Sequence, residues 1–221
     1  MKTKKKYLLL LSIVFSFIML LSLSACNSSS NNDELRELAK VEIKEFEGKD
    51  LSSILEFREN SINGPQKVDI DTYRLKVDGL VNEPTDYTYD EVLTNTKYKK
   101  LVRLNCIEGW SVDILWEGIL LREVFDKVEV KDTANTVIFY AADGYSTSLP
   151  LDIILEKDMM LAYKMNGVTL PPERGYPFQL IAEDKFGYKW IKWITRIELS
   201  DDEDYLGYWE KRGYDNEANL N

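Results

Sequence analysis

The sequence predicts one domain that mixes α-helices and β-strands, and three observations indicate this fold class. The chain has 221 residues, of which 44% are hydrophobic, which is enough to bury the core of a single globular domain. Short apolar runs of strand character outnumber the helix-like stretches. Their order along the chain is irregular, without the strict βαβ alternation that a doubly wound parallel sheet requires.

The first 25 residues have the features of a secretory signal. Residues 1–6 contain four lysines and no acidic residue, and an apolar run follows over residues 7–23. The run is close to the lower length limit for a membrane-spanning helix, so a transmembrane anchor is one alternative. The tetrapeptide that ends at Cys26 resembles the lipobox of bacterial lipoproteins, in which this cysteine is lipidated. A chance cysteine after an ordinary signal is the other alternative.

This interpretation divides the chain into a signal peptide over residues 1–25, a tether and N-terminal helix over 26–49, and a domain over 50–221. The mature protein is then exported and anchored through acyl chains on Cys26 to the outer face of a bacterial cell membrane. The polar residues 27–32 suit a flexible tether.

The first half of the body contains one helix, a loop, a strand and a capped turn. Apolar residues recur at helical spacing over residues 33–47. Residues 60–66 are rich in turn formers, and residues 73–81 alternate as a strand does. Thr88 followed three residues later by Glu91 predicts a capping box at the start of a short helix.

The central part predicts a strand over residues 101–105 that leads directly into Cys106, and then an amphipathic helix over residues 119–128. Residues 137–142 and 145–149 are strand-like on either side of an Asp-Gly turn, which predicts a β-hairpin.

Three further strands are expected over residues 159–164, 178–182 and 190–199. The tail over residues 201–221 is acidic but contains several aromatic residues, so we expect much of it to pack on the body.

Composition excludes several classes of site. The chain has no histidine and two cysteines, which removes serine–histidine–acid triads, histidine-ligated zinc or haem, disulfide frameworks and four-cysteine metal sites. The net charge is −10 before the signal lysines are removed, so a nucleic-acid partner is not expected. If Cys26 is acylated, Cys106 has no partner within the chain.

Cys106 lies in the strongest local feature, residues 103–110 (RLNCIEGW). A cysteine at a strand end that enters a turn can project its sulfur into a pocket, and Arg103 could help to hold it as thiolate. On this fragment alone, a small buried apolar cysteine is the better interpretation.

Three other segments contain candidate polar groups. Tyr145 follows a tight turn and could donate a hydrogen bond to an oxyanion, although an exposed polar strand face also explains it. Arg174 lies between two proline turns, in a rigid loop suited to an anionic group or to plain solvent exposure. Residues 186–193 (FGYKWIKW) combine Gly187, which permits close backbone approach, with two lysines and two tryptophans that could fill the core instead.

Taken together, these segments resemble one family. The run YRLKVDGLVNEP, LVRLNCIEGW, ADGYSTSLPLD, LAYKMNGVTLPPERGYPFQL, FGYKWIKWITRIEL and GYWEKRGY is similar, in this order over residues 50–215, to the molybdopterin-binding domain of the sulfite oxidase family. That family includes bacterial periplasmic methionine-sulfoxide reductases. The resemblance implies an α+β fold of mixed, mostly antiparallel sheets with short helices.

The resemblance also implies a cofactor, a reaction and partners. The cofactor is a molybdenum–molybdopterin, a pyranopterin whose dithiolene binds molybdenum. The protein supplies one metal ligand, a cysteine thiolate, which here matches Cys106. The reaction is oxygen-atom transfer on a small-molecule substrate. No haem domain lies in the chain, so electrons would pass to or from a separate, membrane-bound redox partner.

The family's site residues carry over by position. Tyr145 matches an active-site tyrosine that donates hydrogen bonds near the reacting oxygens. The positions expected to contact the cofactor are, besides Cys106, Asn60, Arg174, Gly187, Tyr188, Lys189 and Lys192. Arg174 would contact the pterin phosphate, and Gly187 and Tyr188 would offer backbone groups.

Two departures from the family pattern bear on the substrate. Gln179 replaces an arginine, and Glu59 stands where sulfite oxidases have an arginine next to the loop asparagine. A carboxylate at the mouth would repel sulfite, and this favours a neutral substrate such as a sulfoxide. The signal also lacks the arginine pair of the twin-arginine route by which proteins holding this cofactor are usually exported.

Three hypotheses remain at this point. The leading one is a surface-anchored molybdenum oxidoreductase that acts on a small oxyanion or a sulfoxide. The second is a non-catalytic surface lipoprotein that retains the fold and binds a ligand or partner. The third is a thiol enzyme built on Cys106, whose thiolate would depend on Arg103 or another cation.

Overall fold

The computed structural model describes residues 33–220 and divides the chain into two units, one up to Val41 and one from Glu42 onward. The predicted signal segment and Cys26 lie outside the described residues. Among residues 33–220, no helix combines the length and the apolar character that crossing a membrane requires. Residues 33–41 are helical.

The helix predicted over residues 33–47 ends earlier than expected. Residues 45–50 form a two-stranded hairpin, in which Glu47 and Gly48 adopt positive φ values of 50° and 76°. Two consecutive positive φ values are the mark of a tight hairpin turn, and they terminate any helix. The body also begins before residue 50, because the buried Glu42 carboxylate accepts hydrogen bonds from Ser53 Oγ (2.6 Å) and Ile54 N (2.9 Å).

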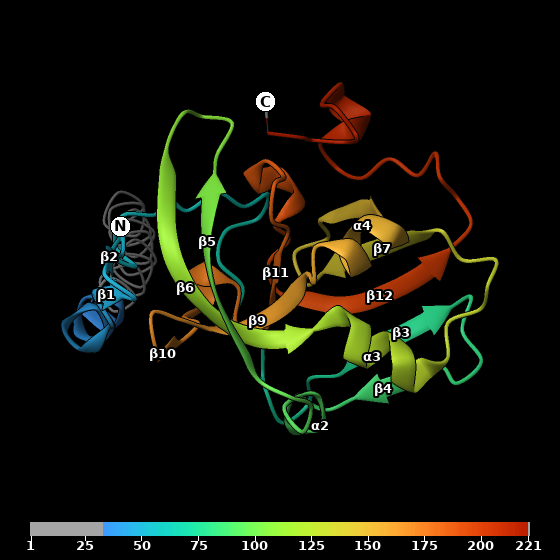
Figure 1. Cartoon of the computed structure of the whole chain (residues 1–221), viewed down its shortest axis with the longest axis horizontal. Coiled ribbons are helices and arrows are strands. Elements are labelled where there is room, and N and C mark those ends of the chain that lie inside the picture. The colour runs from blue at the N-terminus through green and yellow to red at the C-terminus, as the bar shows by residue number, and fades with distance from the viewer. Residues whose placement is uncertain (1–32, 221) are drawn as a thin grey trace, which may run out of the picture. The chain divides into compact units, whose positions relative to one another are not determined.

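The second unit contains two five-stranded sheets and short helices, which confirms the predicted α+β class (Figure 1). The element bounds in chain order are β1 Glu45–Phe46, β2 Lys49–Asp50, β3 Leu75–Gly79, β4 Thr85–Tyr87, α2 Tyr89–Val92, β5 Tyr98–Asn105, β6 Ser111–Leu120, α3 Leu121–Val128, β7 Thr136–Ala141, β8 Ser146–Pro150, α4 Leu151–Glu156, β9 Met160–Met165, β10 Val168–Thr169, η1 Pro172–Arg174, β11 Gln179–Ile181, η2 Gly187–Lys189, β12 Ile194–Ser200 and η3 Glu210–Arg212.

One sheet has the strand order β4-β3-β12-β7-β8. All its pairs are antiparallel except that of β12 with β3, which are parallel neighbours although they lie far apart in the sequence. In β3, Leu75 and Val77 are buried and Lys76 between them is exposed. This alternation is typical of a strand with one buried face. The predicted hairpin of β7 and β8 is confirmed, with Phe139 opposite Thr147.

The other sheet has the order β10-β9-β6-β5, and β11 also pairs with β9. The long β5–β6 hairpin is antiparallel from Tyr98 opposite Gly118 to Asn105 opposite Ser111. Gly118 is required by packing, since a Cβ atom there would lie 2.4 Å from the Leu161 carbonyl oxygen on β9. This hairpin brings Cys106 to one end of the sheet.

Several elements were predicted well and others were missed. The capping box at Thr88 is confirmed, with Glu91 N donating to Thr88 Oγ1 and Glu91 Oε2 accepting from Thr88 N. The sequence prediction overlooked β6 and α4. The strand predicted over residues 190–199 begins only at Ile194, because the positive φ of 54° at Trp193 breaks the extended backbone.

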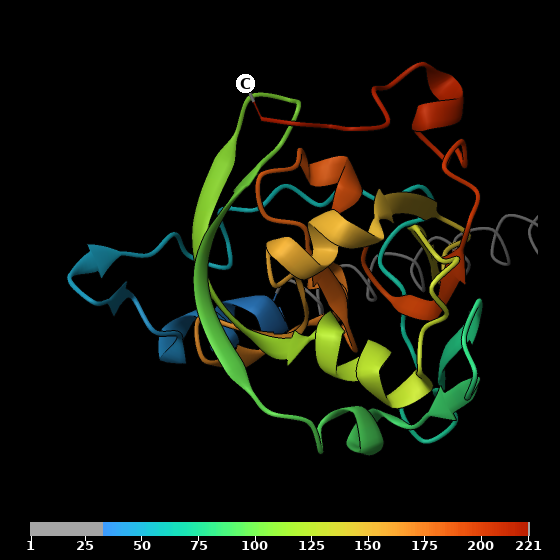
Figure 2. The same ribbon diagram turned by 45° about the vertical axis from the view of Figure 1, so that its right-hand side comes forward.

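The tail after β12 packs on the body, as its aromatic residues predict. In Figures 1 and 2 it passes over the end of the domain that also holds the β5–β6 turn. Phe186 N donates to the Ala218 carbonyl (2.9 Å), and Tyr208 N donates to the Ser146 carbonyl (2.9 Å). The tail is therefore placed beside the residues that surround Cys106.

Candidate active site

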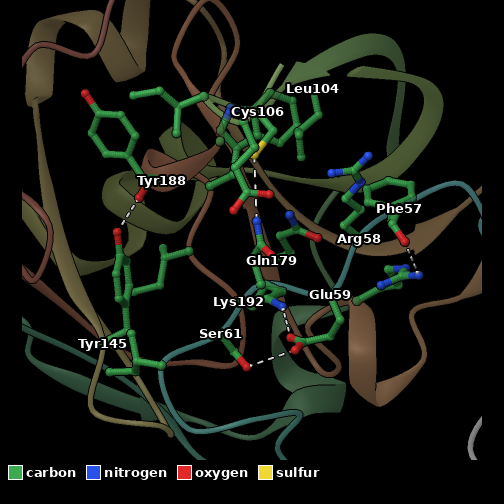
Figure 3. Close-up of a pocket in the computed structure, with 18 of the residues that line it drawn as sticks. Phe57, Arg58, Glu59, Ser61, Leu104, Cys106, Tyr145, Gln179, Tyr188 and Lys192 are labelled. Carbon is green, nitrogen blue, oxygen red and sulfur yellow. Dashed lines mark hydrogen bonds and ion pairs between the residues drawn. The ribbon is translucent and has the colours of Figure 1, made fainter. Parts of the chain in front are cut away.

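A cavity of about 360 Å³ opens at the end of the β5–β6 hairpin. Its walls come from the loop before β3, the β5–β6 turn, the β7–β8 turn, the segments 173–179 and 187–193, and the tail. Figure 3 shows Cys106 between Tyr145 and Tyr188 on the left and Phe57 and Arg58 on the right. Residues far apart in the sequence therefore converge on one thiol.

Cys106 is half-buried, and its sulfur faces the cavity rather than the core. The residue begins a tight turn, in which Gly109 N donates to the Cys106 carbonyl (3.1 Å) and Cys106 N donates to the Trp110 carbonyl (2.9 Å). Asn60 Nδ2 lies 3.7 Å from Cys106 Sγ and donates to it. The cysteine is thus oriented by its turn and approached by an amide N–H donor.

Burial raises the pKa of the Cys106 thiol. The backbone N–H of Glu108 opposes this shift and the Glu108 carboxylate adds to it, while Asn60 and Arg58 also act to lower the pKa. The expectation that Arg103 stabilises the Cys106 thiolate is wrong. Its guanidinium binds Asp113 across the hairpin through Nε (2.9 Å) and Nη2 (2.5 Å), and it does not line the cavity. The cause is strand alternation, which places neighbouring side chains on opposite faces.

Gly187 and Tyr188 line the same cavity as Cys106. A Cβ atom on Gly187 would contact the Cys106 Cα atom at 3.6 Å, so the two backbones run close together. The Tyr145 hydroxyl donates to the Tyr188 carbonyl (2.5 Å), and burial raises the pKa of Tyr145. This bond uses the single hydroxyl proton, so donation to a substrate oxygen requires that it open.

Arg174 lies at the cationic side of the cavity and is only 6% exposed. Its guanidinium donates to the carbonyls of Ile54 (3.1 Å) and Phe57 (3.3 Å) and stacks on the Phe57 ring at 4.9 Å. Among residues 33–220 no carboxylate comes within 4.0 Å of it, and burial lowers its pKa to about 10. The Glu173 and Glu59 carboxylates offset part of the cost of burying this cation, and a phosphate group would compensate more of it.

Lys192 lines the cavity, but a carboxylate from this chain already binds it. Its Nζ lies 2.8 Å from Glu59 Oε1, and Ser61 Oγ donates to Glu59 Oε2 at 3.2 Å (Figure 3). Burial lowers the pKa of Lys192, and Glu59 opposes that shift. The expectation that Glu59 presents an uncompensated negative charge at the mouth is therefore corrected, because the two charges neutralise each other.

The expectation that Lys189 contacts the cofactor is also corrected, because its side chain is fully buried and lies outside the cavity lining. The Nζ atom donates to Glu210 Oε1 (2.6 Å), the Ser148 carbonyl (2.9 Å) and Asn216 Oδ1 (3.0 Å). Residues 187–189 form a 3₁₀ turn rather than a strand, so the side chain of Lys189 points in a different direction from that of Tyr188.

Buried polar groups in the lining suit a polar ligand. Gln179 is 4% exposed and lines the cavity, so its side chain can offer an amide donor there. Glu173 is 8% exposed, and its Oε1 atom has no partner among residues 33–220. With Arg174, these groups offer a donor, an acceptor and a cation to a group such as a pterin with its phosphate. The single soft thiolate of Cys106 suits a metal that already holds sulfur ligands.

Sequence reasoning missed several lining residues. Arg58 and Glu108 line the cavity, and Trp209 and Tyr214 reach it from the tail. Both tail residues lie in the family-like segment GYWEKRGY, and the aromatic content of the tail predicted that it packs on the body, but neither signal assigned them to the site. No local pattern connects that tail to Cys106.

Comparisons with known proteins agree with this geometry. A family model described as the oxidoreductase molybdopterin binding domain matches residues 62–209. The uncharacterized oxidoreductase YuiH of Bacillus subtilis is 34% identical over 151 residues, 68% of this chain and 76% of its own. A protein of Azospira oryzae that has the name of a protein-methionine-sulfoxide reductase subunit is 33% identical over 67% of this chain and 56% of its own.

Two further similarities cover smaller shares. The catalytic subunit of a protein-methionine-sulfoxide reductase from Ralstonia nicotianae is 30% identical over 58% of this chain and 44% of its own. The chain thus spans about half the length of the two relatives with sulfoxide-reductase names. The crystal structure of a sulfane dehydrogenase from Paracoccus pantotrophus matches with a TM-score of 0.60 at 24% identity, covering 62% of this chain and 40% of that one, which supports the fold.

Proposed function

The chain belongs to the family of oxidoreductase molybdopterin-binding domains, and from this premise we propose that it reduces a neutral organic sulfoxide at the outer face of a bacterial membrane. The family is one of molybdenum–molybdopterin oxidoreductases. The reduction takes two electrons and two protons, and it releases a thioether and water. A separate, membrane-bound redox partner is therefore part of the proposal.

The observation that supports a neutral substrate is the charge of the cavity. Its lining holds four carboxylates, on Glu59, Glu108, Asp143 and Glu173, and three cations, on Arg58, Arg174 and Lys192. The cofactor's phosphate would add negative charge. A site of this balance attracts anions such as sulfite poorly, whereas a sulfoxide has no net charge to be repelled.

The chain's own residues hold and orient the reacting groups. Cys106 supplies the thiolate ligand for the metal, and Asn60 donates to its sulfur. Arg174 is placed for the phosphate, with Gln179 beside it in the lining. When bound, the cofactor supplies two-electron oxygen-atom transfer.

Tyr145 is the residue that this chain offers to the substrate oxygen. Its ring lines the cavity, and the Tyr188 carbonyl holds its hydroxyl in one orientation. The hydroxyl must leave the Tyr188 carbonyl to donate to a sulfoxide oxygen, so one hydrogen bond replaces another when the substrate binds. The raised pKa of Tyr145 keeps the proton on the oxygen, so the group remains a donor at neutral pH.

The names of the relatives support the substrate class and the partner. Two of them are named as subunits of protein-methionine-sulfoxide reductases, which act on a sulfoxide. We extend this chemistry to the present chain, together with anchoring through a lipidated Cys26. The word subunit in both names supports a separate protein that exchanges electrons with the domain.

The test is expression of the full chain in a host that makes the cofactor. Purified protein should contain molybdenum and pterin near one per chain, and it should reduce dimethyl sulfoxide with a chemical electron donor. Sulfite oxidation should be slow in the same preparation. Fast sulfite oxidation without sulfoxide reduction would contradict the substrate class, and protein free of metal from such a host would contradict the cofactor.

Cys106→Ser provides the matched control for the metal ligand. It should abolish turnover while leaving the thermal unfolding of the cofactor-free protein nearly unchanged, because the cysteine is half-buried and its backbone, not its sulfur, makes the turn. Mass spectrometry of the membrane fraction should find acyl chains on Cys26, and an unmodified Cys26 would contradict the anchor.

A further inference from the structure

Five aromatic side chains form one cluster, which we call the aromatic wall: Tyr145, Tyr188, Tyr208, Trp209 and Tyr214. All of them except Tyr208 line the cavity. Neighbouring rings follow one another with centroids 5.8 Å apart for Tyr145 and Tyr208, 5.2 Å for Tyr208 and Trp209, 5.1 Å for Trp209 and Tyr214, and 5.4 Å for Tyr214 and Tyr188. The Tyr145 hydroxyl donates a hydrogen bond to the Tyr188 carbonyl, so the first and last residues of this chain of contacts are also in contact. Three of the five residues belong to the tail.

The tail is held in place by a buried ion pair. Lys189 Nζ lies 2.6 Å from Glu210 Oε1, both side chains are 0% exposed, and Thr147 Oγ1 donates to the same oxygen at 2.7 Å. Gly207 allows the close approach, because a Cβ atom there would lie 2.2 Å from the Ser146 carbonyl oxygen. Glu210 directly follows Trp209 in the sequence, so the pair anchors the backbone beside that indole.

The aromatic wall and the side of the cavity that holds Arg174 differ in chemistry. Tyr145, Tyr188, Trp209 and Tyr214 all line the cavity. Figure 3 shows Tyr145 and Tyr188 on the side opposite Phe57, the ring on which the Arg174 guanidinium stacks. Aromatic faces bind methyl groups and sulfur atoms well and offer nothing to an anion. The wall begins at Tyr145, the residue assigned to the substrate oxygen.

We infer that the tail selects the substrate: Trp209 and Tyr214 bind the apolar arm of a neutral organic sulfoxide, and the buried Lys189–Glu210 pair is a positioning device for them. This inference rests on the proposed function and adds the residues that choose among sulfoxides. A substrate with a larger apolar arm gains more from the wall than a small one does.

The first experiment compares two sulfoxides on the cofactor-loaded full chain. In Trp209→Leu, the KM for methyl p-tolyl sulfoxide should rise about tenfold, with kcat within about twofold, and the KM for dimethyl sulfoxide should change less than about threefold. Methyl p-tolyl sulfone, which serves as a non-reacting analogue, should bind about tenfold more weakly by calorimetry. Tyr98→Leu, at an exposed tyrosine outside the cavity, should leave both KM values unchanged.

The second experiment tests the ion pair as a positioning device. Lys189→Met combined with Glu210→Leu removes both charges without leaving one buried alone. In this variant the KM for the tolyl substrate should rise as it does in Trp209→Leu, and adding Trp209→Leu should raise it no further. Independent, additive effects would contradict the positioning role, as would a purely kcat effect.

Three results would overturn the inference. Equal changes in KM for both sulfoxides would show that the wall does not select by arm size. A large loss of molybdenum from Trp209→Leu would assign the wall to the cofactor. If the wild type is active and every variant still discriminates between the two sulfoxides as the wild type does, this inference alone is overturned. If the cofactor-loaded wild type reduces neither sulfoxide, the proposed function is overturned together with it.

Discussion

The ammonium group of Lys192 lies 2.8 Å from the Glu59 carboxylate, although 133 residues separate the two in sequence. The pair connects the loop before β3 to the segment before β12 at the cavity mouth. It neutralises a cation that would otherwise attract anionic substrates. The sequence shows both residues but gives no reason to join them.

Glu59→Gln should make the site more attractive to anions, because it frees Lys192 and removes one negative charge from the lining. The change in Coulomb energy is roughly 1 kcal/mol across a solvated cavity, so sulfate should inhibit sulfoxide reduction about fivefold more tightly. The inhibition constant at two ionic strengths measures this, and the effect should shrink at high salt. Asp132→Asn, an exposed carboxylate outside the cavity, is the control; an equal shift there would refute the local explanation.

Arg174→Lys should weaken cofactor retention while preserving the charge. A lysine cannot reproduce the forked donors that reach Ile54 and Phe57 and still face a phosphate. Loss of these bonds should lower the free energy of unfolding by about 1–3 kcal/mol and the molybdenum content by roughly tenfold. Metal analysis and urea unfolding measure the two effects, and full molybdenum content in the variant would show that Arg174 does not hold the phosphate.

Asn60→Leu should make the metal couple more difficult to reduce. Its amide donates to Cys106 Sγ at 3.7 Å, and removing a donor leaves more electron density on the thiolate sulfur. The midpoint potential should therefore become more negative, while the molybdenum content stays near one per chain. Electrochemical titration of the loaded protein gives the potential, and an unchanged value would mean that the amide does not bind the sulfur in the loaded state.

Glu210→Gln should destabilise the domain strongly, because it leaves Lys189 buried without a counter-charge. Breaking a buried ion pair costs about 3–5 kcal/mol, whereas the Lys189→Met, Glu210→Leu double variant should lose much less. Urea unfolding of the two variants provides the comparison. Similar stabilities for both would show that the charge of Lys189 is solvated in some other way.

The domain should lose stability as the pH rises above about 10, the pKa of an exposed tyrosine. Burial raises the pKa of Tyr89 and Tyr188 to about 12, and it raises the pKa of Tyr145 as well. These groups keep their protons in the folded state when the unfolded chain loses them, so their contribution is complete below pH ~10 and is lost as the pH increases. Absorbance at 295 nm together with urea unfolding from pH 8 to pH 11 tests this, and a flat stability profile would contradict it.

Local chemistry explains what the sequence predicted correctly. The capping box at Thr88, the Asp-Gly hairpin after β7 and the strand that ends at Cys106 each depend on residues a few positions apart. The family resemblance identified Cys106 and placed Asn60, Tyr145 and Arg174 on one cavity. Two element boundaries that failed, the helix end near Glu47 and the strand before Ile194, needed positive φ values that no periodic pattern reveals. The expectations for Arg103 and Lys189 failed because each side chain binds a carboxylate of this chain instead.

The sequence by itself therefore determined the fold class, the family and the thiol at the centre of the site, since these depend on local spacing and on the order of short segments. Only the tertiary structure decided which charges meet. Lys192 is neutralised by Glu59, Lys189 turns away to Glu210, and Trp209 reaches the cavity from the far end of the chain. Such contacts depend on how sheets and loops pack in space, because electrostatic and aromatic contacts act over a few ångströms regardless of separation along the chain.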